Sequence, residues 1–400
     1  MDNQYIEREV KEKFERISSI YNLVALVGPR QTGKTTFLKK LLSGPDSSYI
    51  SLDDPDAREL FDADIKKFEN QYIKDYKIII IDEVQYGKDA GLKLKYLADK
   101  HKNKKIWITS SSQIILSKEV LSWLVGRVSV INIYPFSLNE FLISKNQKEI
   151  TPTILQRNIT EHVIYGGYPK VVLTEEREAK KTLLKDLSET MILKDMAKTF
   201  SIEDVSSLEK TSRYLSNFIG NVIIYENISR EIGISFQTIK KYLDAMEKSY
   251  LIIRLQPFFN NKLSEVIKHP KLYFVDTGMR SAIANQFPIS LEKEGPLFEN
   301  YILNEILKMG FTVKYWLTKS KAEVDFVIEK DNEIIPVEVK ITPTVGKVAV
   351  SFRSFIERYK PKRGFIVYYK GEHQEVEVNG CKVLFTDILG LQKVLIKSSE

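Results

Sequence analysis

The residues with the clearest chemical pattern lie between Leu23 and Leu42. Five apolar residues, Leu23 to Val27, are typical of a buried strand, and the segment after them matches G-x-x-x-x-G-K-[ST] without a mismatch. Glycines let such a loop approach phosphate oxygens closely, and the N–H groups at the start of the next helix bind anions. The segment therefore predicts a nucleoside triphosphate site. The expected binding residues are Gly28, Pro29, Arg30, Gln31, Thr32, Gly33, Lys34, Thr35 and Thr36.

Two side chains of this loop and two acids further on suit Mg²⁺-dependent ATP hydrolysis. Lys34 is expected to reach the β- and γ-phosphates, and the Thr35 hydroxyl to ligate Mg²⁺. Four isoleucines, Ile78 to Ile81, predict a central parallel strand that ends in Asp82 and Glu83. Ligands bind at this end of such strands. Asp82 is therefore expected to hold Mg²⁺ through water, and Glu83 to orient or deprotonate the attacking water.

Two more residues are candidates for catalysis, each with a plain alternative. The strand predicted for KIWITSSSQ ends in a run of hydroxyl side chains, of which Ser111 is the candidate γ-phosphate sensor, although serines here also form turns. Arg127 stands directly before a predicted strand, Val128 to Ile133. It is a candidate arginine finger acting across a subunit boundary, which would require a homo-oligomer. A solvated arginine after a helix-ending glycine explains it equally well.

A second constellation of charged residues lies near the C-terminus. Glu299 belongs to a predicted amphipathic helix, Asp325 to one predicted strand, and Glu338 and Lys340 to the next. Residues two apart in a strand share a face, so Glu338 and Lys340 point the same way. Glu299, Asp325 and Glu338 are candidate ligands of a second divalent cation, Mg²⁺ or Mn²⁺, with Lys340 orienting water or stabilising charge. A retained fold without chemistry is the alternative.

The composition indicates a folded protein of two or three domains. Of 400 residues, 43% are apolar and 28% charged, and Cys381 has no cysteine partner for an internal disulfide. The opening residues lack an apolar signal core, and no run of about twenty apolar residues predicts a membrane span. We expect a cytoplasmic protein without a membrane partner.

The distribution of charge favours a nucleic-acid partner, DNA rather than RNA. The net charge is +7, and the stretch from Lys340 to Lys370 holds eight basic residues against Glu357 as its one acid. Such a local cluster suits phosphate backbones, although a solvated face explains it too. The candidate DNA contacts in this stretch are Lys347, Arg353 and Arg358.

A second candidate DNA contact is a helix-turn-helix pattern between Ile223 and Leu255. Two amphipathic segments flank a turn at Gly233, and a strand follows them. Ser235 is expected to cap the second helix. The outward face of that helix would then carry the candidate DNA contacts Gln237, Lys240 and Lys241. The pair of helices can equally serve as a structural joint.

These motifs occur among elements that predict an α/β fold. A leading amphipathic helix is expected from Tyr5 to Ile20, helices that cover the nucleotide from Ile150 to about Phe200, and a C-terminal helix–strand–strand–strand–helix–strand order.

The motif series resembles the AAA+-type ATPases common in archaea and some bacteria. The motifs are GPRQTGKTT, LDDP, IIIIDEVQ, TSSS, LVGR and YPFSLNEF, with Ser110 where that family usually has glycine. The resemblance implies the ATP-site roles of Lys34, Thr35, Asp82 and Glu83. It also implies a helical lid with a winged helix, followed by a C-terminal domain of restriction-endonuclease type. The order of Glu299, Asp325, Glu338 and Lys340 is similar to that of the PD-(D/E)XK nucleases, with Val324 where proline is usual.

The expected organisation has four parts: an AAA+-type P-loop domain (1–145), a helical lid (146–222), a winged helix with connector (223–288), and a nuclease-like domain (289–400). The expected function is Mg²⁺-dependent ATP binding and hydrolysis coupled to DNA binding, with metal-dependent cleavage by the last domain as a further step. A nucleotide-controlled switch that binds DNA or protein without cleavage is the competing hypothesis. A defence ATPase acting on RNA is a third.

Overall fold

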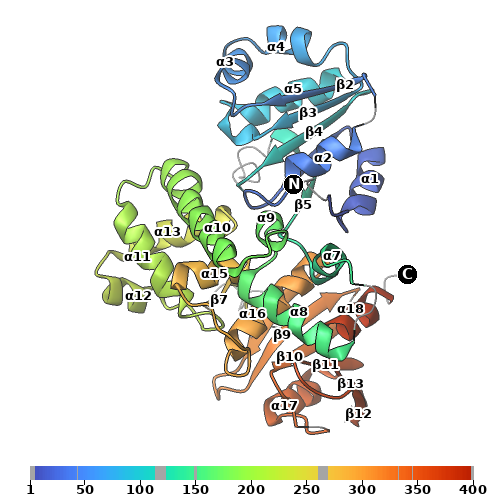
Figure 1. Ribbon diagram of the computed structural model, residues 1–400, viewed down its shortest axis with the longest axis vertical. Helices are drawn as coiled ribbons and strands as arrows, with labels where there is room; N and C mark the ends of the chain where they lie inside the picture. The colour runs from blue at the N-terminus through green and yellow to red at the C-terminus, as the bar shows by residue number, and fades with distance from the viewer. Residues whose placement is uncertain are drawn as a thin grey trace.

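The computed structural model describes residues 5–42, 44–112, 123–147, 151–259, 269–331, 333–344 and 346–397. Figure 1 shows three regions: an N-terminal sheet with its helices, a largely helical region at its side, and a C-terminal sheet with its helices at the opposite end.

The N-terminal sheet is wholly parallel. Its strands, in spatial order, are β2 (Ser47–Ser51), β3 (Ile78–Asp82), β4 (Lys105–Ser110), β1 (Leu23–Val27) and β5 (Val128–Asn132). The carboxyl ends of parallel strands share one edge of a sheet. The loop after β1 therefore meets the acids after β3 and the hydroxyl side chains at the end of β4.

Helices cover both faces of this sheet because its strands are apolar on both sides. Within β1, Val24 and Leu26 pack with Phe14 and Phe37 from the helices next to the phosphate loop. Leu23, Ala25 and Val27 point to the other face and pack with helices from later in the chain. The helices of this region are α1 (Lys11–Ile20), α2 (Lys34–Leu41), α3 (Pro55–Ala63), α4 (Ile65–Tyr72) and α5 (Ala90–Lys100). The next helix, α7 (Leu138–Ser144), lies beside the C-terminal region, where the N–H of Leu138 donates to Glu305 (Figure 1).

The leading helix is shorter than predicted, because α1 begins at Lys11 and the predicted start was Tyr5. Arg8 lies in the non-helical segment before it and donates hydrogen bonds to the carbonyls of Thr32 and Tyr134, both at 2.7 Å. These tertiary contacts hold residues 5–8 outside the helix despite the amphipathic sequence.

The middle region is mostly helical and contains a two-stranded antiparallel sheet. Its elements are α8 (Pro152–Tyr165), α9 (Pro169–Val172), α10 (Arg177–Thr190), a π-helical segment (Met191–Lys198), α11 (Val205–Ser216), α12 (Tyr225–Ile232), α13 (Phe236–Lys248), β6 (Ile252–Leu255), β7 (Lys271–Phe274) and α15 (Thr277–Ala284). Gly233 ends α12 in the left-handed region, and the Ser235 side chain caps α13.

The predicted lid helices do not all lie over the nucleotide site. In α8, Thr160 Oγ1 lies 2.7 Å from the hydroxyl of Tyr369, and His162 contacts the hydroxyl of Tyr301, so this helix packs on the C-terminal region. The π-helical segment instead reaches the phosphate loop through Asp195. The apolar pattern of a helix specifies one buried face, and the partner of that face was decided by tertiary packing.

The YGGYP turn after α8 has a packing role. A Cβ on Gly166 would lie 2.0 Å from Asp276 Oδ1, and a Cβ on Gly278 would lie 2.1 Å from the carbonyl oxygen of Tyr165. Asp276 caps α15 and also accepts the N–H of Gly167 at 2.8 Å. The YGGYP turn therefore packs tightly against the first turn of α15.

The C-terminal sheet is mixed, with the spatial order β12-β13-β11-β10-β9-β8. Its strands and helices are α16 (Gly295–Lys308), β8 (Thr312–Leu317), β9 (Glu323–Lys330), β10 (Glu333–Lys340), α17 (Val350–Tyr359), β11 (Arg363–Tyr368), β12 (Gln374–Val378), β13 (Cys381–Thr386) and α18 (Ile388–Lys397). The first six elements follow the predicted order. The last three were not predicted, although the alternation QEVEV is a strand signal.

Among the described helices, none combines the length and apolar character needed to cross a bilayer.

Candidate functional sites

The phosphate-loop motif lies between β1 and α2, where its glycines are required by close contacts. A Cβ on Gly28 would lie 2.0 Å from the carbonyl oxygen of Ile133, and Gly33 begins α2 in the left-handed region. Lys34 is only 4% exposed, and its Nζ donates to the carbonyls of Gly28 and Pro29 at 3.0 and 2.8 Å. The loop therefore folds around its own lysine.

Asp82 connects the ends of three strands to the loop. Its Oδ2 accepts hydrogen bonds from Thr35 Oγ1 and from the Tyr49 hydroxyl, both at 2.8 Å, and its Oδ1 accepts one from Thr109. A carboxylate beside a hydroxyl is a hard-oxygen donor set that fits Mg²⁺. Thr35 and Asp82 are thus the residues here that would hold the ion.

Glu83 has a backbone conformation that is rare for a residue with a side chain. Its φ is 56°, and its N–H donates to Thr109 Oγ1 at 2.9 Å. Such conformations cost of order 1–3 kcal/mol and persist where the surroundings impose them. Gln85 Nε2 donates both to Glu83 and to Ser111 Oγ, the latter at 2.9 Å. Ser111 is therefore connected to the acid through Gln85.

The central charge of this site is the buried Lys34, which has acidic side chains around it. Burial lowers the pKa of Lys34, while the charges of Glu83, Asp82 and Asp195 oppose that shift. Burial and the neighbouring Asp82 raise the pKa of the Tyr49 hydroxyl, which stays protonated as a donor. An anionic phosphate group beside Lys34 would further favour its charged form.

Asp195, Tyr49 and Gln85 belong to this site but were not predicted, whereas Thr109 belongs to the predicted run of hydroxyl side chains. Asp195 comes from the π-helical segment and forms an ion pair with Arg30 of the loop at 2.8 Å. The sequence did contain a signal for Asp195, which is a charged residue on the apolar face of a helix. Met191 and Met196 beside it are fully buried.

Arg127 lies away from the phosphate loop of its own chain. Val128, the first residue of β5, pairs with Leu23 at the amino end of β1, whereas the loop follows the carboxyl end. Arg127 Nε donates to Asp99 Oδ1 at 2.6 Å. Any contact with a phosphate would therefore involve a second copy of the chain, as the arginine-finger hypothesis requires.

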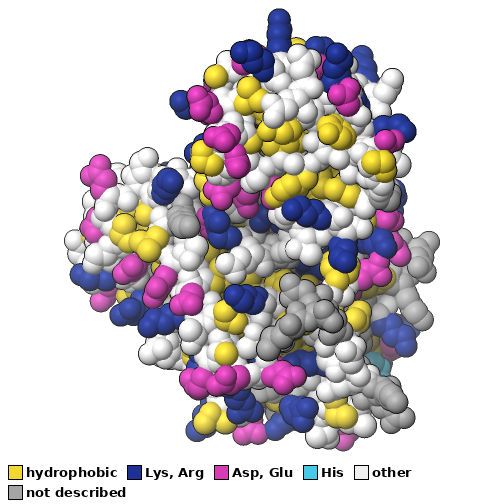
Figure 2. All heavy atoms as spheres, turned by 45° about the horizontal axis from the view of Figure 1, so that its top comes forward, with side chains coloured by type: hydrophobic (Ala, Val, Ile, Leu, Met, Phe, Trp, Pro, Cys, Tyr) yellow, Lys and Arg dark blue, Asp and Glu magenta, His cyan; other side chains and the backbone are white. Residues whose placement is uncertain are grey.

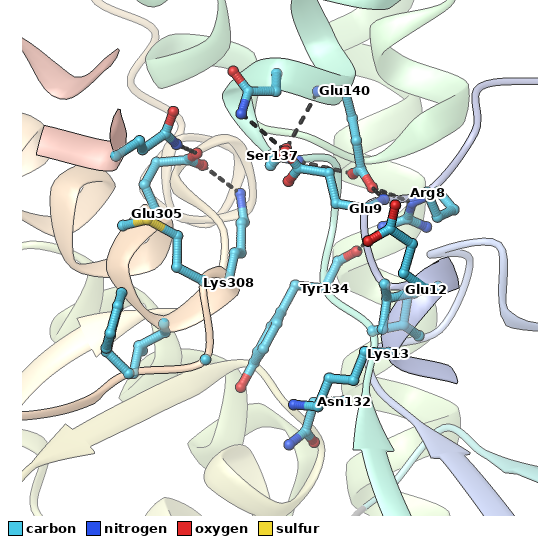
Figure 3. A pocket seen from close by; sticks show the side chains of 18 of the residues that line it. Arg8, Glu9, Glu12, Lys13, Asn132, Tyr134, Ser137, Glu140, Glu305 and Lys308 are labelled. Atoms are coloured by element: carbon cyan, nitrogen blue, oxygen red, sulfur yellow. Dashed lines mark hydrogen bonds and ion pairs between the residues drawn. The ribbon is translucent and has the colours of Figure 1, made fainter. Parts of the chain in front are cut away.

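A cavity of ≈ 870 Å³ lies between the N-terminal region and the C-terminal helices, with Arg8 in its wall. Figure 3 shows Arg8 and Glu140 on one side of it and Glu305 with Lys308 on the other. Arg8 Nε donates to Glu140 Oε1 at 2.9 Å, and its Nη1 donates to the carbonyl of Thr32 in the loop. Arg8 thus lies between the phosphate loop and this cavity.

The structure brings the predicted C-terminal residues together, and a lysine lies beside each of the two glutamates Glu299 and Glu338. Lys340 Nζ lies 2.7 Å from Glu338 Oε1. Lys271 of β7, which is 3% exposed, lies 3.7 Å from Glu299 Oε1 and also contacts Glu323. Asp325 Oδ2 accepts the N–H of Val339 at 2.8 Å. Lys271 was not predicted as part of this cluster.

The prediction of a second cation at Glu299, Asp325 and Glu338 is not supported. Among the described residues, no group of three or more His, Cys, Asp or Glu side chains is arranged to hold a metal ion. Lys271 and Lys340 supply positive charge instead. Burial and the charge of Asp325 raise the pKa of Glu299 to about 8 and that of Glu338 to about 7. Within the described residues, Glu338 Oε2 has no hydrogen-bond partner.

The candidate DNA contacts are all on the surface. Gln237, Lys240 and Lys241 are exposed on α13, and Lys241 Nζ donates to the Ser201 carbonyl at 3.0 Å. Lys347, Arg353 and Arg358 are exposed at or near α17. On the face in Figure 2, basic and acidic side chains are interspersed, so that face has no extended surface of one sign.

The parallel sheet with its phosphate loop defines the class of the N-terminal region. Residues 21–142 match the family model described as AAA domain. Together with the sheet and loop, this match supports an AAA-type ATPase. Residues 156–290 and 294–386 match two domains of unknown function, DUF8612 and DUF4143.

Relatives of similar length exist in bacteria and archaea. An uncharacterized protein of Haemophilus influenzae is 26% identical over 385 residues, which cover 90% of this chain and 91% of the relative. The uncharacterized protein MJ1544 of Methanocaldococcus jannaschii is 27% identical over 374 residues, covering 86% and 81%.

Two solved structures show weaker likeness. The Walker-type ATPase paby2304 of Pyrococcus abyssi is 15% identical with a TM-score of 0.46, and the match covers 70% of this chain and 96% of that one. Cdc6p of Pyrobaculum aerophilum is 12% identical with a TM-score of 0.30, covering 74% and 96%. Structural similarities with TM-scores this low support no conclusion about function.

Proposed function

We propose that this chain binds ATP with Mg²⁺ at the phosphate loop and hydrolyses it. The observation that carries the proposal is the hydrogen bond of 2.8 Å between Thr35 Oγ1 and Asp82 Oδ2. Thr35 directly follows the buried Lys34 in the chain. This combination of hydroxyl, carboxylate and ammonium groups suits a metal–triphosphate complex. The AAA domain match over residues 21–142 supports it.

Each side chain has its own task in the proposed reaction. Lys34 exchanges its carbonyl acceptors for phosphate oxygens, and Glu83 takes the proton from the attacking water. Gln85 donates to Glu83 and to Ser111, and so holds the glutamate in position. Bound Mg²⁺, held by Thr35 and Asp82, supplies positive charge that stabilises the transferring phosphoryl group.

The test separates ATP binding from ATP hydrolysis. We expect Lys34→Ala to abolish binding of a fluorescent ATP analogue, and Glu83→Gln to bind it normally while phosphate release falls by about 10²–10⁴-fold. Glu59→Gln, an exposed position on α3, is the matched control and should behave as wild type. Phosphate release by Glu83→Gln at the wild-type rate would remove the glutamate from the mechanism.

For the C-terminal domain we propose DNA binding without cleavage, coupled to the nucleotide site. The specific observation in favour of binding alone is that Lys271, which is outside the predicted nuclease residues, lies 3.7 Å from Glu299 and supplies positive charge where a nuclease would bind its metal. Lys347, Arg353 and Arg358 make no ion pair with the described acids, which leaves their charge available to phosphates. The α12–α13 pair with β6 and β7 would act as a winged helix that presents Gln237 to the duplex.

DNA binding and DNA cleavage are tested in separate assays. Arg353→Ala with Arg358→Ala should weaken binding of single-stranded, duplex or junction DNA and reduce its salt dependence, because two phosphate contacts are lost. If the kind of DNA that the chain binds also stimulates phosphate release, this would support coupling between DNA binding and ATP hydrolysis. Plasmid should remain intact with Mg²⁺ or Mn²⁺. Cleavage that disappears in both Asp325→Ala and Lys340→Ala would replace this proposal with a nuclease.

A further inference from the structure

The phosphate loop contains an arginine that the proposed reaction leaves unused. Arg30 Nε donates to both carboxylate oxygens of Asp195, at 3.0 and 3.1 Å, and its Nη2 donates to Oδ1 at 2.8 Å. Nη2 also donates to the hydroxyl of Tyr86 at 2.8 Å. Asp195 is only 4% exposed. A charge-assisted contact of several hydrogen bonds is among the stronger polar interactions in proteins, so the loop is tethered to the π-helical segment.

Asp195 lies within the electrostatic reach of the groups that would handle the phosphates. Its charge acts on Lys34, and the charge of Glu83 acts on it in turn. A triphosphate at the loop would add several negative charges close to this carboxylate. Like charges repel strongly where water is excluded, and the phosphates would offer Arg30 a more highly charged partner than one carboxylate.

The segment that carries Asp195 has an unusual backbone. Residues Met191–Lys198 form a π-helix, in which each hydrogen bond spans one residue more than in the α-helix that precedes it. Segments of this kind are rare and occur frequently at functional sites. The Asp195 carbonyl accepts Ser249 Oγ at 3.1 Å, and buried Ser249 ends α13. A movement of Asp195 therefore reaches the helix that carries Gln237.

We propose that Asp195 is a nucleotide sensor, and this rests on the proposed binding of ATP at the loop. In the nucleotide-free protein its carboxylate holds Arg30 and fixes the π-helical segment against the loop. A bound triphosphate takes over the guanidinium and repels the carboxylate, so the Arg30–Asp195 pair opens. The released segment then alters the position of α13 through Ser249. Nucleotide occupancy is thereby reported to the α12–α13 pair.

Two measurements on the full chain test this sensor. Asp195→Asn removes the competing charge, so we expect it to bind a fluorescent ATP analogue about tenfold more tightly than wild type, equal to about 1.4 kcal/mol. Asp186→Asn is the matched control, because Asp186 is exposed on α10 and should bind as wild type does. In wild type, the ATP analogue should accelerate amide hydrogen exchange in residues 191–198 and change it in residues 236–249. In Asp195→Asn, exchange in residues 191–198 should be fast already without nucleotide.

The outcomes distinguish this inference from the proposed function. If wild type does not bind the ATP analogue, or if Lys34→Ala binds it equally well, the ATP site itself is wrong. If wild type binds in a Lys34-dependent manner but exchange in residues 191–198 is unchanged by nucleotide, the sensor is wrong. The exchange measurement on wild type decides this even if Asp195→Asn folds poorly, because it requires no variant.

Discussion

Thr35 Oγ1 lies 2.8 Å from Asp82 Oδ2, although the two residues belong to segments on either side of a third strand. Thr35 follows β1 and Asp82 ends β3, and β4 runs between these strands. The contact exists because all three strands are parallel and end at the same edge. The fold of the sheet therefore places these two oxygens side by side, which lowers the ordering cost of binding Mg²⁺.

Thr35 variants test this arrangement directly. Thr35→Ala removes the hydroxyl, and we expect the Mg²⁺-dependent rate of phosphate release to fall by about 10²-fold, because a metal ligand contributes several kcal/mol. Thr35→Ser keeps the hydroxyl and should retain most of the activity, with a similar Mg²⁺ concentration at half-maximal rate. Equal activities of the Ala and Ser variants in a Mg²⁺ titration would show that the hydroxyl does not bind the ion.

Arg8 is predicted to be essential for stability. It is 6% exposed and pairs with Glu140, which is 3% exposed and also caps α7. Arg8→Ala leaves a buried carboxylate without its charge partner, so the free energy of unfolding should fall by about 3–5 kcal/mol in urea titrations. Arg16→Ala, at an exposed position on α1, is the control and should change it by less than about 0.5 kcal/mol. A similar loss in both variants would contradict the role of the pair.

His162 is predicted to make the protein less stable in mild acid. It is 1% exposed, and burial lowers its pKa well below 6.5, with the nearby Lys308 acting in the same direction. Below about pH 6.5 the unfolded chain therefore binds a proton that the folded chain does not. The stability is complete above that pH and falls as the pH decreases, by up to about 1.4 kcal/mol per pH unit.

The comparison of two histidine variants isolates this effect. His162→Gln keeps a donor for the carbonyl of Phe136 but cannot titrate, so the free energy of unfolding should depend less on pH between about pH 5 and pH 6.5. His373→Gln, at an exposed position, should follow the wild-type curve. If His162→Gln also follows it, another group causes the acid sensitivity.

The arginine-finger hypothesis for Arg127 is testable by mixing chains. Arg127→Ala should lower phosphate release by about 10³-fold or more if the guanidinium acts on a neighbouring copy. Adding inactive Glu83→Gln chains should then restore activity, since they supply an intact Arg127 to sites with an intact Glu83. If mixing does not restore activity, and sedimentation shows that the chains are monomeric, the arginine-finger hypothesis is wrong. The role of Arg127 is then limited to its contact with Asp99.

The sequence alone predicted the phosphate loop and the strand ends beside it, because these features depend on short, contiguous patterns. The apolar runs before Gly28 and Asp82 indicate buried strands, and parallel strands bring their ends to one edge. The order of the first C-terminal elements followed from the same kind of pattern. The start of α1 was predicted incorrectly, because the contacts of Arg8 override the local preference of residues 5–10.

Tertiary structure decided which distant side chains meet. Asp195 joins Arg30 across 165 residues of chain, and Lys271 from β7 lies among the acids of the C-terminal domain. Periodicity defines the buried face of a helix or strand but not the partner of that face. The sequence therefore determined where the phosphate loop lies, and only the packing of separate segments determined which charged side chains lie beside it.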